Sequence, residues 1–121
     1  MIVDDNKTYR NSLKKLLNEY PQLSEVTEAF NADEMFELIG DDPPDIVTMD
    51  VSMPGMDGFD ATEKLLSRHS SVKVIILTIY DTDEYRKRAK QSGAFTYIVK
   101  QDVVTKLDAA LNSIFKQTGL S

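Results

Sequence analysis

The sequence has 121 residues, a length that suits one domain with one hydrophobic core. Its formal net charge is −6, from 14 basic and 20 acidic residues, so the chain repels the phosphate backbone of nucleic acids and we expect no direct contact with DNA or RNA. No apolar stretch approaches the roughly 20 residues that span a membrane. No signal peptide is visible and cysteine is absent, which favours a globular domain in the cytoplasm.

The first part of the chain alternates between short apolar runs and apolar residues at helical spacing. Met1–Val3 is the first apolar run, and the spacing over residues 9–20 predicts a helix that Pro21 ends. A weak strand is expected over residues 25–30. A second helix is expected over 31–40, with an asparagine cap at its start and a glycine at its end.

The rest of the chain continues this alternation. Further strands are expected at Ile46–Met49, Val72–Leu77 and Phe95–Val99. Further helices are expected at residues 59–66, 81–92 and 103–114, and Gly93 is placed to end the second of these. Strands that alternate with helices imply parallel pairing and right-handed crossovers. The predicted fold class is therefore α/β, with an open doubly wound parallel sheet.

Polar residues stand at the ends of four of the apolar runs. Asp5, with Asp4 before it, follows the first run; Asp50, Thr78 and Lys100 follow the runs that end at residues 49, 77 and 99. Because ligands bind outside the carboxyl ends of the strands in sheets of this kind, we expect these side chains to meet at one edge.

The residue types at this edge point to phosphoryl chemistry with a divalent cation. Asp4, Asp5 and Asp50 offer only oxygen ligands, which favour Mg²⁺ or Mn²⁺. A carboxylate can also be the nucleophile toward a phosphoryl donor and form an aspartyl-phosphate. Lys100 would neutralise charge on the transferring group, and the Thr78 hydroxyl would bind one of its oxygens.

All of these residues except Asp50, whose following loop is shaped by Pro54, Gly55 and Gly58, also have a ready ordinary interpretation. The acids before the first helix could act only at its N-terminus, where Asp5 or Asn6 would be the cap. Thr78 taken alone could be a hydroxyl satisfied at a strand end, and Lys100 alone a solvated surface charge. Their occurrence together at matching strand ends favours the functional interpretation.

The chain resembles, over essentially its full length, the receiver domain of two-component response regulators (CheY-like). The matching segments are Val3-Asp4-Asp5-Asn6, Met49-Asp50-Val51-Ser52-Met53-Pro54-Gly55-Met56-Asp57-Gly58, Leu77-Thr78, Gly93-Ala94 and Tyr97-Ile98-Val99-Lys100. The resemblance implies a five-stranded parallel sheet in the order 2-1-3-4-5 flanked by five helices. It further implies a phosphorylation-dependent signalling switch, not an enzyme beyond its own Mg²⁺-dependent self-phosphorylation and self-dephosphorylation.

The resemblance also assigns roles to individual residues. Asp50 would accept a phosphoryl group from a sensor histidine kinase, with Thr78 and Lys100 assisting. Asp5, Asp50 and the Ser52 backbone carbonyl would hold Mg²⁺, and Asp4 would ligate it directly or through water. Thr78 and Tyr97 would form the switch pair; for Tyr97, permanent packing on the core is the alternative.

Residues 77–94 look most like receivers joined to a LuxR-type helix-turn-helix. We expect residues 1–121 to be a single receiver domain with no DNA-binding effector domain in this chain, since the tail at residues 117–121 lies just past the fifth helix. The chain is then either a fragment of a transcription factor, which we favour, or a stand-alone receiver. Homodimerisation that depends on phosphorylation is expected as an option. Only three residues precede Asp4, which suggests a trimmed N-terminus or an internal methionine.

Residues close to Lys100, Asp50 and Thr78 carry two further expectations. Gln101 follows Lys100 where many receivers have proline, so we expect a trans peptide bond and an altered loop. Ser52 and Tyr80 lie two places beyond Asp50 and Thr78, where side chains border the path of hydrolytic water. The bulk of Tyr80 predicts slow self-dephosphorylation.

Three other functions fit the sequence less well. A small-molecule phosphohydrolase needs a second acid two residues after the nucleophile, where this chain has Ser52. A phosphorylation-independent pseudo-receiver would be expected to lose Asp50, Lys100 or an acidic partner. Flavin binding requires a phosphate-cradling loop after the first strand, which is missing. The signalling switch is favoured, with the pseudo-receiver interaction module as the alternative.

Overall fold

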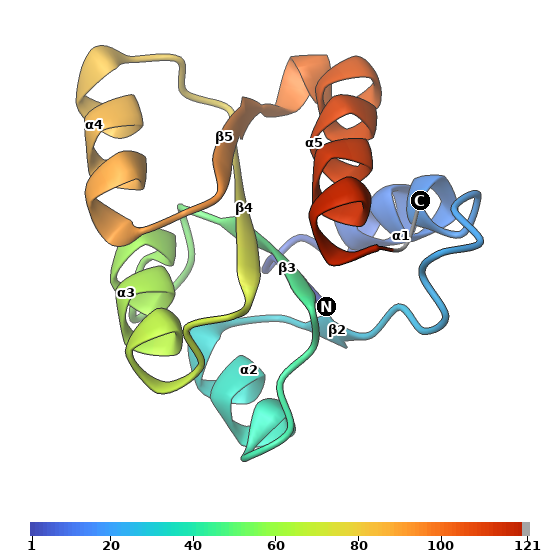
Figure 1. Cartoon of the computed structure of the whole chain (residues 1–121). Coiled ribbons are helices and arrows are strands. Elements are labelled where there is room, and N and C mark those ends of the chain that lie inside the picture. Colours follow the sequence, from blue (N-terminus) through green and yellow to red (C-terminus); the bar gives the residue numbers. More distant parts are fainter. Residues whose placement is uncertain (120–121) are drawn as a thin grey trace.

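Five parallel strands form one sheet, and the computed structural model describes residues 1–119. The strands lie in the order β2-β1-β3-β4-β5, as the resemblance implied (Figure 1). Their bounds are β1 Ile2–Val3, β2 Glu28–Ala29, β3 Ile46–Asp50, β4 Lys73–Thr78 and β5 Thr96–Val99. The last residues of the expected tail, 120–121, lie outside the described part of the chain.

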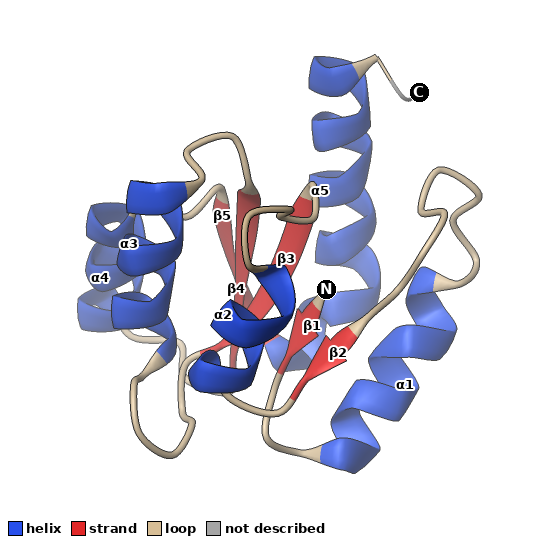
Figure 2. Ribbon diagram, turned by 90° about the horizontal axis from the view of Figure 1, so that it is seen from below, coloured by secondary structure: helices blue, strands red, loops and turns tan. Residues whose placement is uncertain are grey.

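Helices cover both faces of the sheet (Figure 2). α1 and α5 lie on one face, α2 and α3 lie on the other, and α4 lies beside α3 near β5. Their bounds are α1 Lys7–Leu17, α2 Ala32–Ile39, α3 Gly58–Arg68, α4 Asp83–Ser92 and α5 Val103–Thr118. A short 3₁₀ turn, η1 Lys100–Asp102, joins β5 to α5. Among residues 1–119, no helix has the length and apolar character that crossing a bilayer requires.

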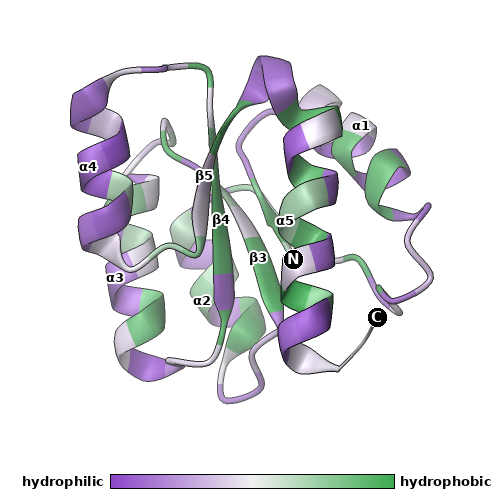
Figure 3. Ribbon diagram, turned by 45° about the horizontal axis from the view of Figure 1, so that its top comes forward, coloured by the Kyte–Doolittle hydropathy of each residue, from purple (hydrophilic) through white to green (hydrophobic). Residues whose placement is uncertain are grey.

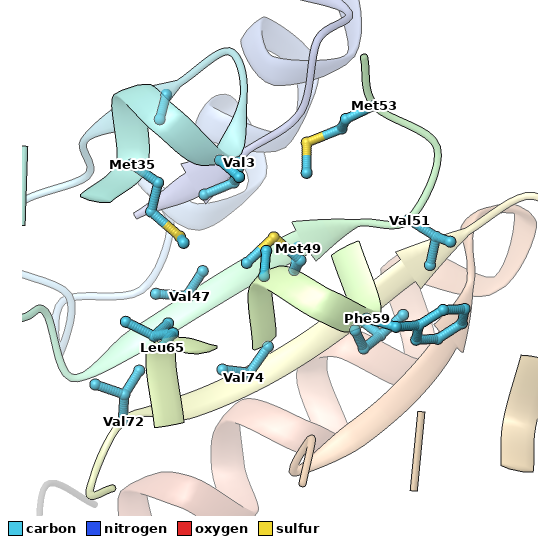
Figure 4. Close-up of a cluster of buried hydrophobic side chains, with 14 of the residues drawn as sticks. Val3, Met35, Val47, Met49, Val51, Met53, Phe59, Leu65, Val72 and Val74 are labelled. Atoms are coloured by element: carbon cyan, nitrogen blue, oxygen red, sulfur yellow. The ribbon is translucent and has the colours of Figure 1, made fainter. Parts of the chain in front are cut away.

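Each face of the sheet has its own hydrophobic cluster. The cluster beneath α2 and α3 includes Val3, Met35, Val47, Met49, Phe59, Leu65 and Val74 (Figure 4). The cluster beneath α1 and α5 includes Ile2, Leu13, Ile75, Leu77, Leu107, Leu111 and Phe115. β4 contributes to both clusters because successive side chains of a strand point to opposite faces. Burial of each large side chain contributes about 1.5–3 kcal/mol to the free energy of unfolding. The strand ends that carry the polar residues are therefore held firmly in place.

The hydropathy of the elements agrees with this arrangement. β3 and β4 are largely hydrophobic along their length, whereas α4 is mostly hydrophilic and packs only one narrow side against the protein (Figure 3). Buried residues of α4 are limited to Ala89 and Ser92. The continuous apolar runs of β3 and β4 are therefore explained by burial on both faces, as expected for central parallel strands.

Side-chain caps fix the starts of four helices and hence the ends of the preceding loops. Asn6, Asn31, Asp57 and Thr82 each accept a hydrogen bond from a backbone N–H in the first turn of the helix that follows. Such a cap contributes about 1 kcal/mol to the stability of the folded protein. The asparagine cap predicted at residue 31 is confirmed, and so are the glycines that end α2 and α4, at positions 40 and 93.

Several predicted boundaries are wrong; α5, for example, continues to Thr118, beyond the expected residue 114. Three others concern the first helix, the fourth helix and the second strand. The first helix ends at Leu17, not at Pro21: residues 18–20 leave it through tight turns, and Tyr20 alone is disfavoured in helical conformation by the proline that follows it. The fourth helix begins at Asp83 and not at residue 81, because Thr82 is its cap. The second strand covers only Glu28–Ala29 of the expected 25–30, since its sole neighbour, β1, offers two residues to pair with.

Candidate functional site

Three carboxylates meet at the carboxyl edge of the sheet. Asp4 and Asp5 follow β1, and Asp50 is the last residue of β3. One oxygen from each lies within 4.8 Å of the others. Asp4 and Asp50 are buried, whereas Asp5 is exposed. The structure thus confirms that these acids converge. Asp5 and Asp50 meet although they lie 45 residues apart in the sequence.

Lys100 supplies the positive charge at this edge. Its Nζ lies 2.9 Å from Asp4 Oδ2 and 3.4 Å from Asp50 Oδ1, and its side chain is only 16% exposed. The side chain is therefore no solvated surface charge. The residue begins the η1 turn, and every peptide bond among the described residues is trans, including Lys100–Gln101, as predicted.

The surroundings of Asp50 disfavour its ionised form. Burial, followed by the negative charge of Asp4, raises the pKa of the Asp50 carboxyl from 3.8 to about 6. Lys100 acts in the opposite direction and offsets part of this effect. The like charges are only partly balanced by one ammonium group. An additional cation at this site would therefore be bound favourably.

The backbone around Asp4 is held by neighbouring polar groups. The Asn6 N–H donates to Asp4 Oδ1 at 2.8 Å, and Arg10 Nη1 donates to the Asp4 carbonyl oxygen at 2.7 Å. Arg10 in turn pairs with Glu28, at 3.2 Å. Asn6, not Asp5, caps α1, so neither acid before this helix serves as its cap. Sequence reasoning missed Arg10, because one basic residue in a helix carries no signal of its own.

Gly58 fixes the loop that follows Asp50. A Cβ atom at this position would lie 2.1 Å from the Asp50 carbonyl oxygen, which no side chain can tolerate. The Gly58 N–H donates to the Val51 carbonyl oxygen at 3.0 Å. The start of α3 thus lies directly against the backbone of Asp50. Ser52 lies exposed in the loop between them, and its carbonyl as a metal ligand stays a prediction.

Thr78 lies at the same edge on the neighbouring strand. The β3–β4 register pairs Asp50 with Leu77, so Thr78 is one residue further along. It is buried, and its Oγ1 accepts a hydrogen bond from the Tyr80 N–H at 3.2 Å. The hydroxyl is thus held by the loop between β4 and α4, and its action on a phosphoryl group stays a prediction.

Tyr97 is linked to the same loop from β5. Its ring is partly exposed, and its hydroxyl donates a hydrogen bond to the Tyr80 carbonyl oxygen. Burial, followed by the charge of Asp81, raises the pKa of Tyr97. Both members of the predicted switch pair therefore contact Tyr80, although the switching itself is not tested by this geometry.

Tyr80 is itself part of a series of edge-to-face aromatic contacts. Its ring lies against Tyr85 of α4, with centroids 5.3 Å apart, and Tyr85 lies against Phe59 of α3 at 5.5 Å. Tyr80 remains 46% exposed at the end of this series. The loop after β4 is therefore supported by contacts with α4 that the sequence pattern did not predict.

Comparison with known proteins agrees with this geometry. Residues 1–112 match the family described as the response regulator receiver domain. The chain is 32% identical over 115 residues to the response regulator GacA of Pseudomonas viridiflava, covering 95% of this chain and 54% of that protein. It is 32% identical over 101 residues to the transcriptional regulatory protein DegU of Brevibacillus brevis, covering 84% of this chain and 43% of that protein. The chain thus spans about half the length of these curated relatives.

Solved structures show the same likeness. A two-component response regulator of the LuxR family from Aurantimonas sp. SI85-9A1 superposes with a TM-score of 0.88 at 29% identity, covering 97% of this chain and 84% of that one. A CheY-like receiver domain protein from Methanospirillum hungatei JF-1 gives a TM-score of 0.79 at 28% identity, covering 96% and 94%. With its sequence matched over nearly all of its length, the chain belongs to the response regulator receiver domain family.

Proposed function

We propose that this chain is a phosphorylation-dependent signalling switch in which Asp50 accepts a phosphoryl group from a sensor histidine kinase. The observation that carries the proposal is the surroundings of Asp50, a buried carboxylate with two further acids beside it and Lys100 Nζ 3.4 Å from its Oδ1. Such a site combines a nucleophile with a cation that can stabilise a transferring phosphoryl group. Membership of the receiver family supports the choice of donor.

The transfer forms one bond and breaks another. An Oδ atom of Asp50 forms a bond to phosphorus while the bond between phosphorus and its donor breaks. With a phosphohistidine donor, the broken bond is P–N, and its electron pair leaves with the imidazole, which takes up a proton. The nucleophile must be the ionised carboxylate, and with a pKa of about 6 Asp50 is largely ionised at neutral pH. Lys100 stabilises charge on the phosphoryl oxygens.

The acidic cluster fits a hard divalent cation. Its donors are all oxygen, and three carboxylates lie within 4.8 Å of one another. Asp4, Asp5 and Asp50, with the Ser52 backbone carbonyl, are the residues that would hold Mg²⁺ or Mn²⁺. The bound cation supplies positive charge that lowers the pKa of Asp50 and offsets the charge of the phosphoryl group.

The proposed response to phosphorylation involves the loop after β4. The Thr78 hydroxyl moves to a phosphoryl oxygen and gives up its contact with the Tyr80 N–H, which is 3.2 Å long in this structure. Tyr97 then leaves the Tyr80 carbonyl oxygen and turns inward. A change of this kind shifts the balance between two pre-existing packings.

The proposal extends to what the switch controls. A relative is named a transcriptional regulatory protein, and a similar structure is a LuxR-family response regulator. We therefore propose that residues 1–121 form one receiver domain that acts in the cytoplasm on a DNA-binding output domain. Homodimerisation after phosphorylation is one route by which the signal would be passed on.

Intact-mass spectrometry tests the proposed reaction. The chain is incubated with acetyl phosphate and Mg²⁺, with parallel samples that contain EDTA or the Asp50→Asn variant. The proposal predicts a gain of one phosphoryl group in the wild type with Mg²⁺ and no gain in either control. A folded wild type that gains no phosphoryl group would contradict the proposal and favour the phosphorylation-independent interaction module.

A further inference from the structure

The ammonium group of Lys100 requires fixed contacts that hold it in position. A lysine ammonium sits on a flexible four-carbon stem, and a group that stabilises developing charge is effective only when its position is fixed before the reaction. Two carboxylates contact this ammonium, Asp4 at 2.9 Å and Asp50 at 3.4 Å. During transfer, one of those carboxylates becomes the nucleophile and its charge is redistributed. Another contact that does not change during the reaction would keep the ammonium in position.

Tyr9 provides such a contact. Lys100 Nζ lies 4.1 Å from the centroid of the Tyr9 ring. This distance is well inside the roughly 6 Å over which the negative face of an aromatic ring attracts a cation. Because the lysine side chain is only 16% exposed, water screens this attraction little. The ammonium is therefore held by two acids and by one ring face.

The position of Tyr9 is fixed by the same residues that form the site. The Tyr9 N–H donates to Asn6 Oδ1 at 2.9 Å, and the Asn6 N–H donates to Asp4 Oδ1 at 2.8 Å. The other oxygen of Asp4 accepts from Lys100. Asp4, Asn6, Tyr9 and Lys100 thus form a closed ring of contacts. The first turn of α1 sets the position of the ring relative to the acid that binds the lysine.

The hydroxyl of Tyr9 is not what holds the ring. The Tyr9 Oη atom is buried and has no hydrogen-bond partner within the described chain. The ring also packs against the apolar cluster beneath α1 and α5. The aromatic face, rather than the phenol oxygen, is therefore the feature of this residue that the site uses.

We propose that Tyr9 is a positioning residue that holds the Lys100 ammonium on its ring face, ready to stabilise the phosphoryl group that Asp50 receives. The role rests on the proposed phosphoryl transfer to Asp50. This role gives α1 a part in the chemistry, which the position of Tyr9 in the sequence does not indicate. It also distinguishes tyrosine or phenylalanine at this position from aliphatic residues of similar volume.

The test compares Tyr9→Leu, which keeps apolar volume but has no ring face, with Tyr9→Phe, which keeps the ring. Phosphorylation by acetyl phosphate with Mg²⁺ is followed over a range of donor concentrations. Tyr9→Leu should lower the maximal rate constant by about 3- to 30-fold, the range that a cation–π contact of ordinary strength implies. Tyr9→Phe should restore most of that loss. The donor concentration for half-maximal rate should change little, because Tyr9 acts on Lys100 and not on donor binding.

A second measurement reads the position of the ammonium without any reaction. The NMR signals of the Lys100 ε-methylene protons in the unphosphorylated protein should be shifted upfield by the ring current of Tyr9. The shift should persist in Tyr9→Phe and disappear in Tyr9→Leu. Tyr20→Leu is a matched control, because Tyr20 lies just past the far end of α1 and contacts Phe115 and Asp108 instead. Tyr20→Leu should at most lower the free energy of unfolding. The rate of phosphorylation and the Lys100 signals should stay unchanged.

The outcomes separate this inference from the function on which it rests. A wild type that reacts normally beside an equally fast Tyr9→Leu would overturn the positioning role alone. Loss of rate in Tyr9→Phe equal to that in Tyr9→Leu would also overturn it, because the hydroxyl would then matter. A wild type that accepts no phosphoryl group would overturn the proposed function, whatever the Lys100 signals show. A slow Tyr9→Leu, rescue by phenylalanine and a lost upfield shift together support the role.

Discussion

Replacing Asp50 with asparagine should stabilise the metal-free protein at neutral pH. Asp50 is 7% exposed, and burial together with the charge of Asp4 raises its pKa from 3.8 to about 6. Each tenfold change in acidity corresponds to about 1.4 kcal/mol, so ionised Asp50 lowers the free energy of unfolding by about 3 kcal/mol. Asparagine has nearly the same shape and no charge, and Lys100 keeps its contact with Asp4 at 2.9 Å.

The sign of the pH dependence follows from the direction of this pKa change. Because the folded-state pKa lies above the unfolded-state value, the unfolded chain loses its proton first as the pH rises. The stability of the wild type should therefore fall between about pH 4 and pH 6 and then level off. The advantage of Asp50→Asn should be largest above pH 6 and should shrink near pH 4.

Urea unfolding in EDTA at pH 4 and pH 7.5 measures this difference. For a slope of about 1–3 kcal/mol per molar urea, the midpoint at pH 7.5 should rise by about 1–3 M in the variant. Asp41→Asn, at an exposed carboxylate of the turn before β3, is the matched control and should change little. Mg²⁺ should stabilise the wild type more than Asp50→Asn. An unchanged or lower midpoint for Asp50→Asn at pH 7.5 would contradict a destabilising effect of ionised Asp50.

Other variants test the loops and caps around the site. Gly58→Ala should lower the free energy of unfolding by at least about 3 kcal/mol, because its Cβ would meet the backbone of the preceding strand at 2.1 Å. Gly55→Ala, where φ is 81° and the space is open, should lose only about 1–2 kcal/mol; equal losses in denaturant unfolding would contradict the clash. Tyr80→Ala should shorten the half-life of the phosphorylated protein, measured by intact mass, and an unchanged half-life would argue against shielding by this ring. Asn31→Ala should lower the free energy of unfolding by about 1 kcal/mol, because the cap of α2 is lost, whereas Asn31→Asp should keep both the cap and the stability.

The convergence at the carboxyl edge could be predicted because it depends on strand direction alone. Parallel strands end at one edge, so residues that follow apolar runs must come close whatever the details of packing. Asp50 and Lys100 meet in this way, although they lie 50 residues apart. The asparagine cap at residue 31 was equally predictable, because capping depends on one residue and the turn after it.

Other features depend on packing that spacing along the chain does not encode. The contact between Tyr9 and Lys100 joins α1 to the turn after β5, and apolar spacing marks Tyr9 only as a core residue. The approach of Gly58 to the Asp50 backbone is a distance between two main chains, which no residue pattern carries. α1 ends three residues before Tyr20, the residue that Pro21 restricts, so the proline alone does not mark where the helix ends.

The identity of the acceptor residue is tested most directly by chemical trapping. The chain is phosphorylated with acetyl phosphate and Mg²⁺ and then treated with borohydride, which reduces an acyl phosphate of aspartate to homoserine. Peptide mass spectrometry with fragmentation then locates the reduced residue. We expect homoserine at position 50 and at no other aspartate, with none in an untreated sample. Homoserine at Asp5 or Asp57, or phosphate retained on a serine or threonine, would contradict this expectation.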